Sequence, residues 1–439
     1  MADVDALLNG LGRVAAVERM PAVVKGRVRR TVGYSLEVTG CDQSVGSECL
    51  VEVQGGVVPA EVVGFAEGVS YLMPFGDVTG LRPGAAVRPQ RERKGPVIDG
   101  LLGRVVDGLG KPLDGRALEQ VPIAADERPG RFNPLDRVPV TSALDVGVRS
   151  INALLTVGVG QRLGLFAGSG VGKSMLLGMM SRYTAADVVV VGLIGERGRE
   201  VREFIDESLG TAGLKRAVVV ASPADDAPVL RLRAARLATE IAHRYRAMGR
   251  KVLLVMDSLT RVAQAQREIG LAVGEPPTTK GYPPSVFALL PRLVEQAGNL
   301  AGPGSVTAFY TVLAEGDDHQ DPIVDAARAI LDGHIVLSRR LADSGHFPAI
   351  DVEASISRVM PKLVDAQHLR SALSFKELWS RYAQQRDLIS VGAYVAGSDP
   401  LTDRAIKLRA DMNQFLTQPV AERADLKDSI TRLQQLLGA

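Results

Sequence analysis

The sequence predicts an α/β fold in which a small β domain precedes a layered core and a helical domain follows it. From Val24 to about Arg88 the apolar residues alternate with period two, whereas β-branched runs alternate with helical segments between about 140 and 360. After Pro361 the β signal fades. Strands and helices in alternation imply a mostly parallel sheet with helices on both faces. The expected domains are an N-terminal amphipathic docking helix (1–22), a β-barrel (23–90), a connector (91–139), the α/β domain (140–360) and a helical domain (361–439).

Bulk composition narrows the function classes. The chain of 439 residues is expected to form about two or three domains. A net charge of +2 and 4% aromatic residues argue against a polyanionic partner and against base stacking, so no nucleic acid is expected. The longest apolar runs are too short to span a bilayer and no signal peptide is recognised, which predicts a cytosolic protein. Cys41 and Cys49 are the only cysteines and predict no disulfide framework.

The first predicted element is a short amphipathic helix over residues 7–20. Its apolar residues recur at helical spacing, with polar residues largely elsewhere. Such a helix either packs on its own domain or docks a partner, and the sequence leaves both alternatives open. The apolar positions are Leu7, Leu8, Leu11, Val14, Val17 and Met20.

Residues 24–88 predict a small β-barrel or sandwich. Period two is clear from Val32 to Val38 and again from Cys49 to Val53, and Gly or Pro recurs every few residues. The next segment, 88–98, combines charged residues with two prolines and is expected to be a solvated connector.

The core region predicts four strand–helix pairs, followed by C-terminal helices over 374–392 and 401–416. Parallel sheets bind ligands at the carboxyl ends of their strands, so polar residues at those ends are candidates for chemistry. The pairs are 162–166 with 174–183, 187–194 with 199–209, 217–221 with 226–248, and 252–256 with 258–268.

A phosphate-binding loop is predicted between the first strand and the first helix of the core. Residues 167–174 read Ala-Gly-Ser-Gly-Val-Gly-Lys-Ser. The backbone N–H groups of such a loop surround a phosphate, and the helix N-terminus adds partial positive charge. Lys173 is expected to reach the β- and γ-phosphates of ATP and Ser174 to bind Mg²⁺, while Ala167 replaces the usual first glycine. The other loop residues expected to contact the nucleotide are Gly168, Ser169, Gly170, Val171 and Gly172.

Two further strands end near acidic residues at the same edge. The apolar strand 252–256 precedes Asp257, which is expected to hold Mg²⁺ through water or, alternatively, to cap the next helix. The strand 188–194 precedes Glu196 and Arg197. A glutamate there can deprotonate the attacking water and an arginine can contact the γ-phosphate, whereas the alternative is a solvated turn.

These segments, in this order, resemble the catalytic subunits of rotary ATP synthases and, more closely, the flagellar export ATPases. The resemblance covers nearly the whole chain and implies a RecA-like ATPase core. It rests on Phe166–Ser174, Gly192–Glu200, Lys280–Phe287, Glu315–Asp318 and Ile350–Arg358.

The resemblance also implies roles for single residues. Arg358 matches the arginine finger, which in this family enters the neighbouring subunit's nucleotide site. Phe347 matches the aromatic residue that stacks on adenine, and Phe415 matches a second ring of that pocket, although either could be a core residue. The remaining matches are Lys173 and Ser174 to the phosphate and Mg²⁺ contacts, Glu196 to the catalytic carboxylate, Arg197 to a γ-phosphate contact and Asp257 to the Mg²⁺ residue.

The family implies ATP hydrolysis that energises type III export of flagellar proteins, in a homohexameric ring with catalytic sites at subunit junctions. The implied partners are a stalk-like negative regulator on the N-terminal helix, a central coiled-coil protein, and an export gate with substrate–chaperone complexes. The implied location is cytoplasmic, peripheral at the cytoplasmic face of the inner membrane through these partners.

Residues 391–401 lack the acidic segment with which the synthase subunit contacts its shaft, which favours export over synthesis. Three alternatives accompany the export hypothesis. An ATPase of a virulence injectisome is the first alternative, and the sequence does not decide between it and the flagellum. An RNA-dependent ring helicase would need an RNA platform, for which the β domain offers few aromatic residues. A non-catalytic nucleotide-holding subunit is disfavoured by Glu196.

Overall fold

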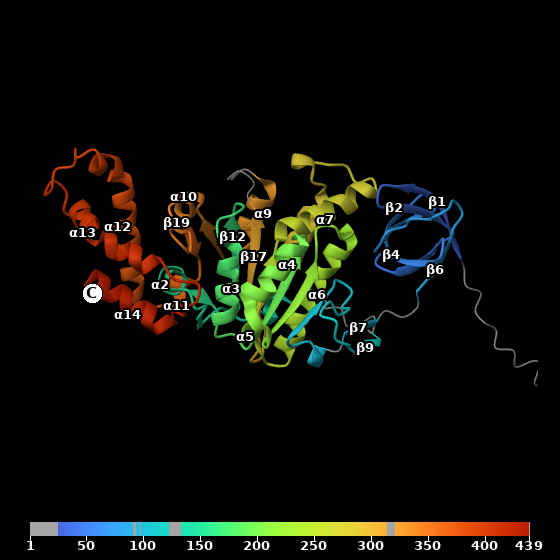
Figure 1. Cartoon of the computed structure of the whole chain (residues 1–439), viewed down its shortest axis with the longest axis horizontal. Coiled ribbons are helices and arrows are strands. Elements are labelled where there is room, and N and C mark those ends of the chain that lie inside the picture. Colours follow the sequence, from blue (N-terminus) through green and yellow to red (C-terminus); the bar gives the residue numbers. More distant parts are fainter. Residues whose placement is uncertain (1–24, 91–93, 97, 123–132, 314–320, 439) are drawn as a thin grey trace, which may run out of the picture. The chain divides into compact units, whose positions relative to one another are not determined.

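The computed structural model describes residues 25–90, 94–96, 98–122, 133–313 and 321–438. The chain forms two compact units that divide between residues 91 and 92 (Figure 1). The helix expected within 1–22 lies outside the described residues. None of the helices in the described ranges is both long and apolar enough to cross a membrane.

The first unit is a closed β-barrel, so the barrel alternative, and not the sandwich, is correct. Every second residue points inward, as Leu36 and Val38 do in the second strand, and these side chains form the buried interior. The strand order is β1-β2-β5-β4-β3-β6, closed by pairing of β6 with β1. The strands are β1 (Gly26–Val32), β2 (Ser35–Thr39), β3 (Glu48–Val53), β4 (Gly56–Ala66), β5 (Val69–Pro74) and β6 (Ala86–Pro89).

The second unit is built on a mostly parallel sheet, which has nine strands within the described residues. Only β19 and the short β16 (Gly298–Asn299) run antiparallel to their neighbours. Two small two-stranded sheets accompany it, β10 (Ala143–Leu144) with β11 (Val157–Gly158) and β7 (Lys94–Pro96) with β9 (Gln120–Pro122). In spatial order the main strands are β19 (Ile350–Ser357), β18 (Gly333–Leu337), β12 (Arg162–Ala167), β17 (Ser305–Leu313), β15 (Lys251–Asp257), β13 (Val188–Ile194), β14 (Ala217–Ser222) and β8 (Arg104–Val106).

Strand β8 lies within the segment that the sequence predicts as a connector. It pairs in parallel with β14 and extends the sheet at that edge. The sequence signal missed it because three residues are too few to show a period of two.

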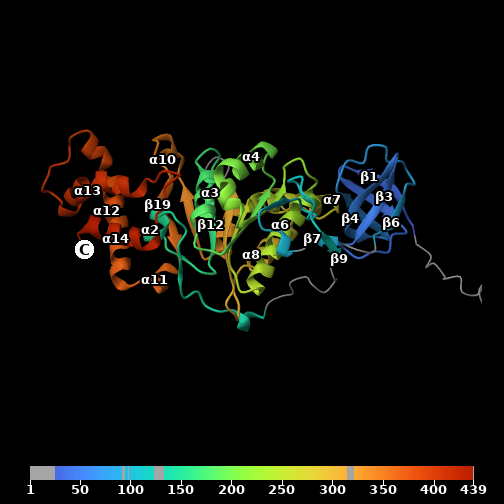
Figure 2. The same ribbon diagram turned by 60° about the horizontal axis from the view of Figure 1, so that its bottom comes forward.

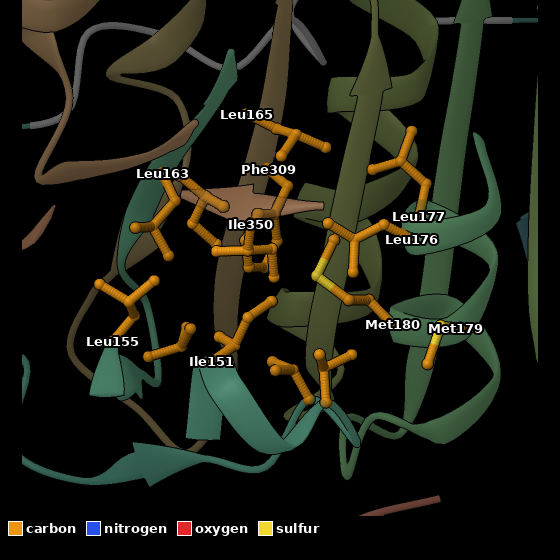
Figure 3. Close-up of a cluster of buried hydrophobic side chains, with 14 of the residues drawn as sticks. Ile151, Leu155, Leu163, Leu165, Leu176, Leu177, Met179, Met180, Phe309 and Ile350 are labelled. Carbon is orange, nitrogen blue, oxygen red and sulfur yellow. The ribbon is translucent and has the colours of Figure 1, made fainter. Parts of the chain in front are cut away.

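Helices pack on both faces of the main sheet. All seven residues of β13 are buried, as expected for a strand covered on both sides. Helix α6 packs on β13, β14 and β15, and α3 packs on β15. Figure 3 shows the large buried cluster to which β12 contributes Leu163 and Leu165, α3 contributes Leu176 and Met180, and β17 contributes Phe309. The helices of this part are α2 (Arg149–Leu154), α3 (Lys173–Tyr183), α4 (Gly198–Glu203), α5 (Gly210–Leu214), α6 (Pro228–Ala247), α7 (Leu259–Ala272), α8 (Pro284–Val294), α9 (Pro322–Ile330) and α10 (Arg339–Asp343), with single turns at Ile98–Gly100, Pro134–Asp136 and Thr279–Gly281 and a π-helical stretch at Phe204–Leu209.

The C-terminal helices α11 (Met360–Leu363), α12 (Ala366–Ser390), α13 (Pro400–Leu416) and α14 (Leu426–Leu437) gather at one end of the second unit (Figure 2). Asp365, Asp399 and Asp425 precede α12, α13 and α14, and each side chain accepts a backbone N–H of the first turn. Such caps satisfy N–H groups that a helix start leaves unpaired. Apolar residues of these helices, including Phe375 and Leu433, join the same buried cluster as the sheet.

The direction of β19 determines where its two ends lie. Because β19 is antiparallel to β18, Ile350 lies beside Leu337 at the carboxyl edge of the sheet, and Ser357 lies beside Gly333 at the amino edge. The residues that flank this strand therefore belong to opposite edges. Phe347 precedes it at the carboxyl edge, where ligands bind, and Arg358 follows it at the amino edge.

Candidate active site

The phosphate loop joins β12 to α3 through two glycines in the left-handed conformation, Gly170 (φ 77°) and Gly172 (φ 86°). No heavy atom lies within 4 Å of the position that a side chain on Gly170 would take. This open space beside backbone N–H groups and a helix N-terminus is suited to a phosphate. Ala167 is the last residue of β12 and is buried, so its methyl group packs in the core and leaves the loop free.

Lys173 joins the carboxylates that end two neighbouring strands. Its Nζ donates to Asp257 Oδ1 at 2.5 Å and to Glu196 Oε1 at 3.2 Å. Burial opposes the charge on this lysine, but attraction to Asp257 and then Glu196 outweighs it, and the pKa of Lys173 is raised. An ammonium group has three hydrogens, so one remains for a phosphate oxygen.

Glu196 lies just after β13 and is poised for proton transfer near neutral pH. Burial, and then repulsion from Asp257, raise the pKa of Glu196 to about 7, against the opposing attraction of Lys173. A hydrogen bond with Glu200, one helical turn further on, raises this pKa as well. The sequence did not single out Glu200, which lies in the first turn of α4 just after Glu196.

Asp257 ends β15 and is free of the capping role that the sequence left open. The hydroxyl of Ser258 instead accepts from Arg261 N at 3.2 Å and caps α7. Thr311 on β17 donates to Asp257 Oδ1 at 2.6 Å and so helps to orient this carboxylate. Sequence reasoning missed Thr311 because only the sheet order brings β17 beside β15; a hydroxyl near the carboxyl end of an apolar strand was the one available signal.

The oxygen donors at this edge fit Mg²⁺, which prefers carboxylate, hydroxyl and phosphate oxygens. Ser174 is exposed in the first turn of α3, one residue after Lys173, and the Asp257 carboxylate hydrogen-bonds that lysine. These two residues would hold the ion, which supplies positive charge to neutralise the β- and γ-phosphates.

The structure does not bring Arg197 to the other site residues. Its side chain is 79% exposed, and Nη1 lies 3.0 Å from Glu200 Oε1. It therefore reaches Glu196 only indirectly, through Glu200. The quoted segment Glu315–Asp318 lies outside the described residues.

The two aromatic candidates, Phe347 and Phe415, differ in their exposure and in what their rings contact. A methyl group built on Gly172 would lie 3.3 Å from the Phe347 ring, so this half-exposed ring stands beside the phosphate loop. Phe415 is 5% exposed and packs against Phe375 with ring centroids 5.5 Å apart. Phe415 is thus largely buried and its part in the base pocket stays a prediction, whereas the Phe347 ring is partly exposed beside the phosphate loop.

Arg358 lies far from the phosphate loop of its own chain. Its Nη1 donates to Leu331 O at 3.1 Å and its backbone N–H donates to Asp332 O at 3.1 Å, both just before β18. The loop that carries Lys173 follows the six-residue strand β12 at the opposite edge of the sheet. Six residues of strand span about 20 Å, more than an arginine side chain can bridge.

Comparison with known proteins agrees with this geometry. The family described as "ATP synthase alpha/beta family, nucleotide-binding domain" matches residues 147–357, and the "T3SS EscN ATPase C-terminal domain" matches residues 364–435. A protein of Pseudomonas aeruginosa named flagellum-specific ATP synthase is 61% identical, over 98% of this chain and 97% of its own. The chain belongs to the flagellum-specific ATP synthase family. A Salmonella typhimurium member is 57% identical over 95% of both chains.

Solved structures support this assignment. The assembled ATPase EscN of the enteropathogenic E. coli type III secretion system matches with a TM-score of 0.88 and 42% identity, over 94% of this chain and all of that chain. EscN in complex with its central stalk EscO matches with a TM-score of 0.85 and 41% identity over the same shares. Together these comparisons confirm three predictions: that the chain is an ATPase, its fold class, and its resemblance to the flagellar export branch.

Proposed function

We propose that this ATPase energises flagellar protein export as a homohexameric ring whose catalytic sites are completed across subunit junctions. The observation that carries the proposal is the separation of Arg358 from Lys173, Glu196 and Asp257 by the length of the sheet. An arginine finger in this chain has no route to its own nucleotide, so it has to act on a neighbour. The assembled state of EscN, a relative by structure and sequence, supports the same arrangement.

Mixing two inactive variants tests whether the sites are shared. In mixed rings of Glu196→Gln and Arg358→Ala chains, about one quarter of the junctions in a random assembly combine an intact Glu196 with an intact Arg358. We expect ATPase activity to reappear in the coexpressed mixture, although each variant alone is inactive. The matched control is Glu196→Gln with Lys173→Ala, which restores no junction because both changes lie on the same side. A mixture that stays as inactive as this control contradicts the proposal.

Within each junction the residues divide the work of phosphoryl transfer. The loop residues 168–172 bind the phosphates, and Lys173 donates its free N–H to them. Ser174 and Asp257 would hold Mg²⁺, and Glu196 accepts a proton from the attacking water. Arg197 turns from Glu200 to contact the γ-phosphate, and Phe347 stacks on adenine.

The pH dependence of hydrolysis tests the role of Glu196 as a base. Only deprotonated Glu196 accepts a proton, so kcat/KM should rise with pH around its pKa of about 7. In Glu200→Gln the amide donates a hydrogen to the Glu196 carboxylate, favours its charged form and lowers its pKa. The acidic limb of kcat/KM against pH should therefore move to lower pH. Titration of ATP is common to both proteins and cancels in the comparison; an unmoved limb, or one moved to higher pH, contradicts this role.

The partners are proposed from the same assignment. The last turn of α12 and the loop that follows it expose Leu388, Val391 and Val395, which are 50%, 75% and 70% accessible. This apolar tip is the proposed contact for a central coiled-coil protein, as the complex of EscN with its central stalk suggests. An export gate and substrate–chaperone complexes are further proposed partners, and they place the ring at the cytoplasmic face of the inner membrane.

The N-terminal segment is proposed to bind a stalk-like negative regulator. Deleting residues 1–20 should abolish capture of the regulator, because the apolar residues that the sequence predicts for docking are lost, while basal ATPase activity remains. A pull-down with the purified regulator measures the first and phosphate release the second. A truncated chain that still captures the regulator would show that the binding surface lies elsewhere.

An injectisome ATPase is the second candidate, favoured by the likeness to EscN. The relatives named flagellum-specific are more similar in sequence, at 61% and 57% identity against 42%. Export of flagellar filament subunits in cells that lack this chain decides the matter. Loss of their export supports the flagellar proposal, and unchanged export contradicts it.

A further inference from the structure

The C-terminal helices hold the segment that carries Phe347. The backbone carbonyl of Phe347 accepts from Gln418 N at 3.0 Å, in the loop after α13. The preceding residue, His346, is 8% exposed, and its ring centroid lies 6.3 Å from that of Trp379 on α12. At the other end of the same segment, Arg339 Nη2 donates to Ser169 O of the phosphate loop at 3.0 Å. Residues 339–347 thus connect the phosphate loop with α12 and α13.

Trp379 is itself fixed from several sides. The Arg409 guanidinium of α13 lies 3.6 Å from the Trp379 ring centroid and 4.5 Å from that of Tyr382. Phe375 stacks on Trp379 at 6.2 Å with nearly parallel rings. Cation–π and aromatic contacts of this kind restrict ring orientation. We call Phe375, Trp379, Tyr382 and Arg409 the Trp379 cluster.

The contact of His346 with this cluster is one of ring packing. His346 Nε2 is buried and makes no hydrogen bond. Burial and then the charge of Arg409 lower the pKa of His346, so the ring is neutral near pH 7. A buried nitrogen without a partner costs free energy, so this nitrogen does not explain why a histidine lies here. What the ring supplies is its packing against Trp379, directly before Phe347 in the chain.

We propose that His346 is a positioning residue, through which the Trp379 cluster holds the Phe347 ring beside the phosphate loop. The C-terminal helices thereby set the affinity for the nucleotide base, while the loop 168–174 supplies the phosphate contacts. This inference rests on the proposed role of Phe347 in stacking on adenine. His346 itself lies outside the nucleotide site and is expected to affect recognition of the base but not of the phosphates.

Binding of two ligands to the full-length chain separates base recognition from phosphate recognition. Mg²⁺–ADP reports on both, and Mg²⁺–tripolyphosphate reports on the phosphate loop alone. His346→Ala should weaken ADP binding about 3- to 10-fold, the range expected for one aromatic contact, and leave tripolyphosphate binding unchanged. His346→Phe keeps a ring against Trp379 and should restore ADP binding to within about twofold of the original chain. The control Leu373→Ala, at a 60% exposed position of α12, should change neither.

Each outcome decides the inference. His346→Ala that binds ADP normally, or that loses both ligands equally, overturns it, because the effect is then absent or merely structural. His346→Phe that behaves like His346→Ala also overturns it. Phe347→Ala provides the separate test of the base contact: if it weakens ADP binding while His346→Ala does not, only the inference about His346 fails. If Phe347→Ala leaves ADP binding unchanged, the stacking role of Phe347 itself is wrong.

Discussion

Replacing Arg358 with alanine is expected to lower ATP turnover about 10³-fold or more, because the charge that develops on the transferred phosphoryl group loses its guanidinium partner. Nucleotide binding to the isolated chain should persist, since Arg358 lies at the amino edge of its own sheet, where its guanidinium donates to the carbonyls of Leu331 and Arg328. Arg358→Lys keeps the charge without the planar fork and should recover only part of the activity. Steady-state phosphate release and ADP calorimetry measure the two effects.

The control for this variant is Arg432→Ala, at a 51% exposed arginine of α14 whose partner is Asp428 one turn away. Its surface ion pair contributes at most about 1 kcal/mol, so turnover should stay near that of the original chain. Thermal unfolding should show both variants folded. Turnover of Arg358→Ala within a few-fold of the control would remove the basis for shared sites.

Replacing Glu196 with glutamine is expected to lower turnover by about 10²- to 10⁴-fold while MgATP still binds. Glutamine has the shape of glutamate but cannot accept the proton of the attacking water. The change also removes the negative charge of one of the two carboxylates that hold Lys173, so Asp257 remains its charged partner and the site repels the nucleotide phosphates less. Affinity for ATP should therefore be equal or higher. Phosphate release and calorimetry with MgATP test both statements.

The matched comparison for Glu196→Gln is Glu200→Gln, which makes the same replacement of a carboxylate by an amide at the neighbouring glutamate. It should retain turnover at high pH, where Glu196 is deprotonated in either protein. If Glu196→Gln hydrolyses ATP at a normal rate, or if both variants are equally inactive at every pH, Glu196 is not the base.

In the proposed ring, Arg358 and Glu196 act at the same junction from opposite sides. Residues that act together on one chemical step have non-additive effects. Once either side chain is removed, removing the other should therefore lower turnover only a little further. The turnover of the double variant should be about the same as that of the less active single variant. Two losses that multiply fully would indicate independent roles in separate steps.

The sequence predicted the site best where its signals are local. The loop 168–174, Asp257 and Glu196 each follow an apolar strand directly, and parallel strands bring their carboxyl ends to one edge. The hydrogen bonds of Lys173 to Asp257 and Glu196 realise that expectation. Phe415 shows the limit, because an aromatic residue near a helix end has the same local pattern whether its ring meets a base or, as here, Phe375.

By itself, the sequence determined that this chain has a barrel, an α/β core and C-terminal helices, and that it carries a phosphate loop followed by two strand-end carboxylates. These features depend on periodicity and spacing within short segments, which chain order alone specifies. Only the tertiary structure decided which residues meet across the sheet. The position of Thr311 beside Asp257, the packing of His346 on Trp379, and the separation of Arg358 from Lys173 depend on strand order and direction. Those are set by packing between distant segments, which no local pattern encodes.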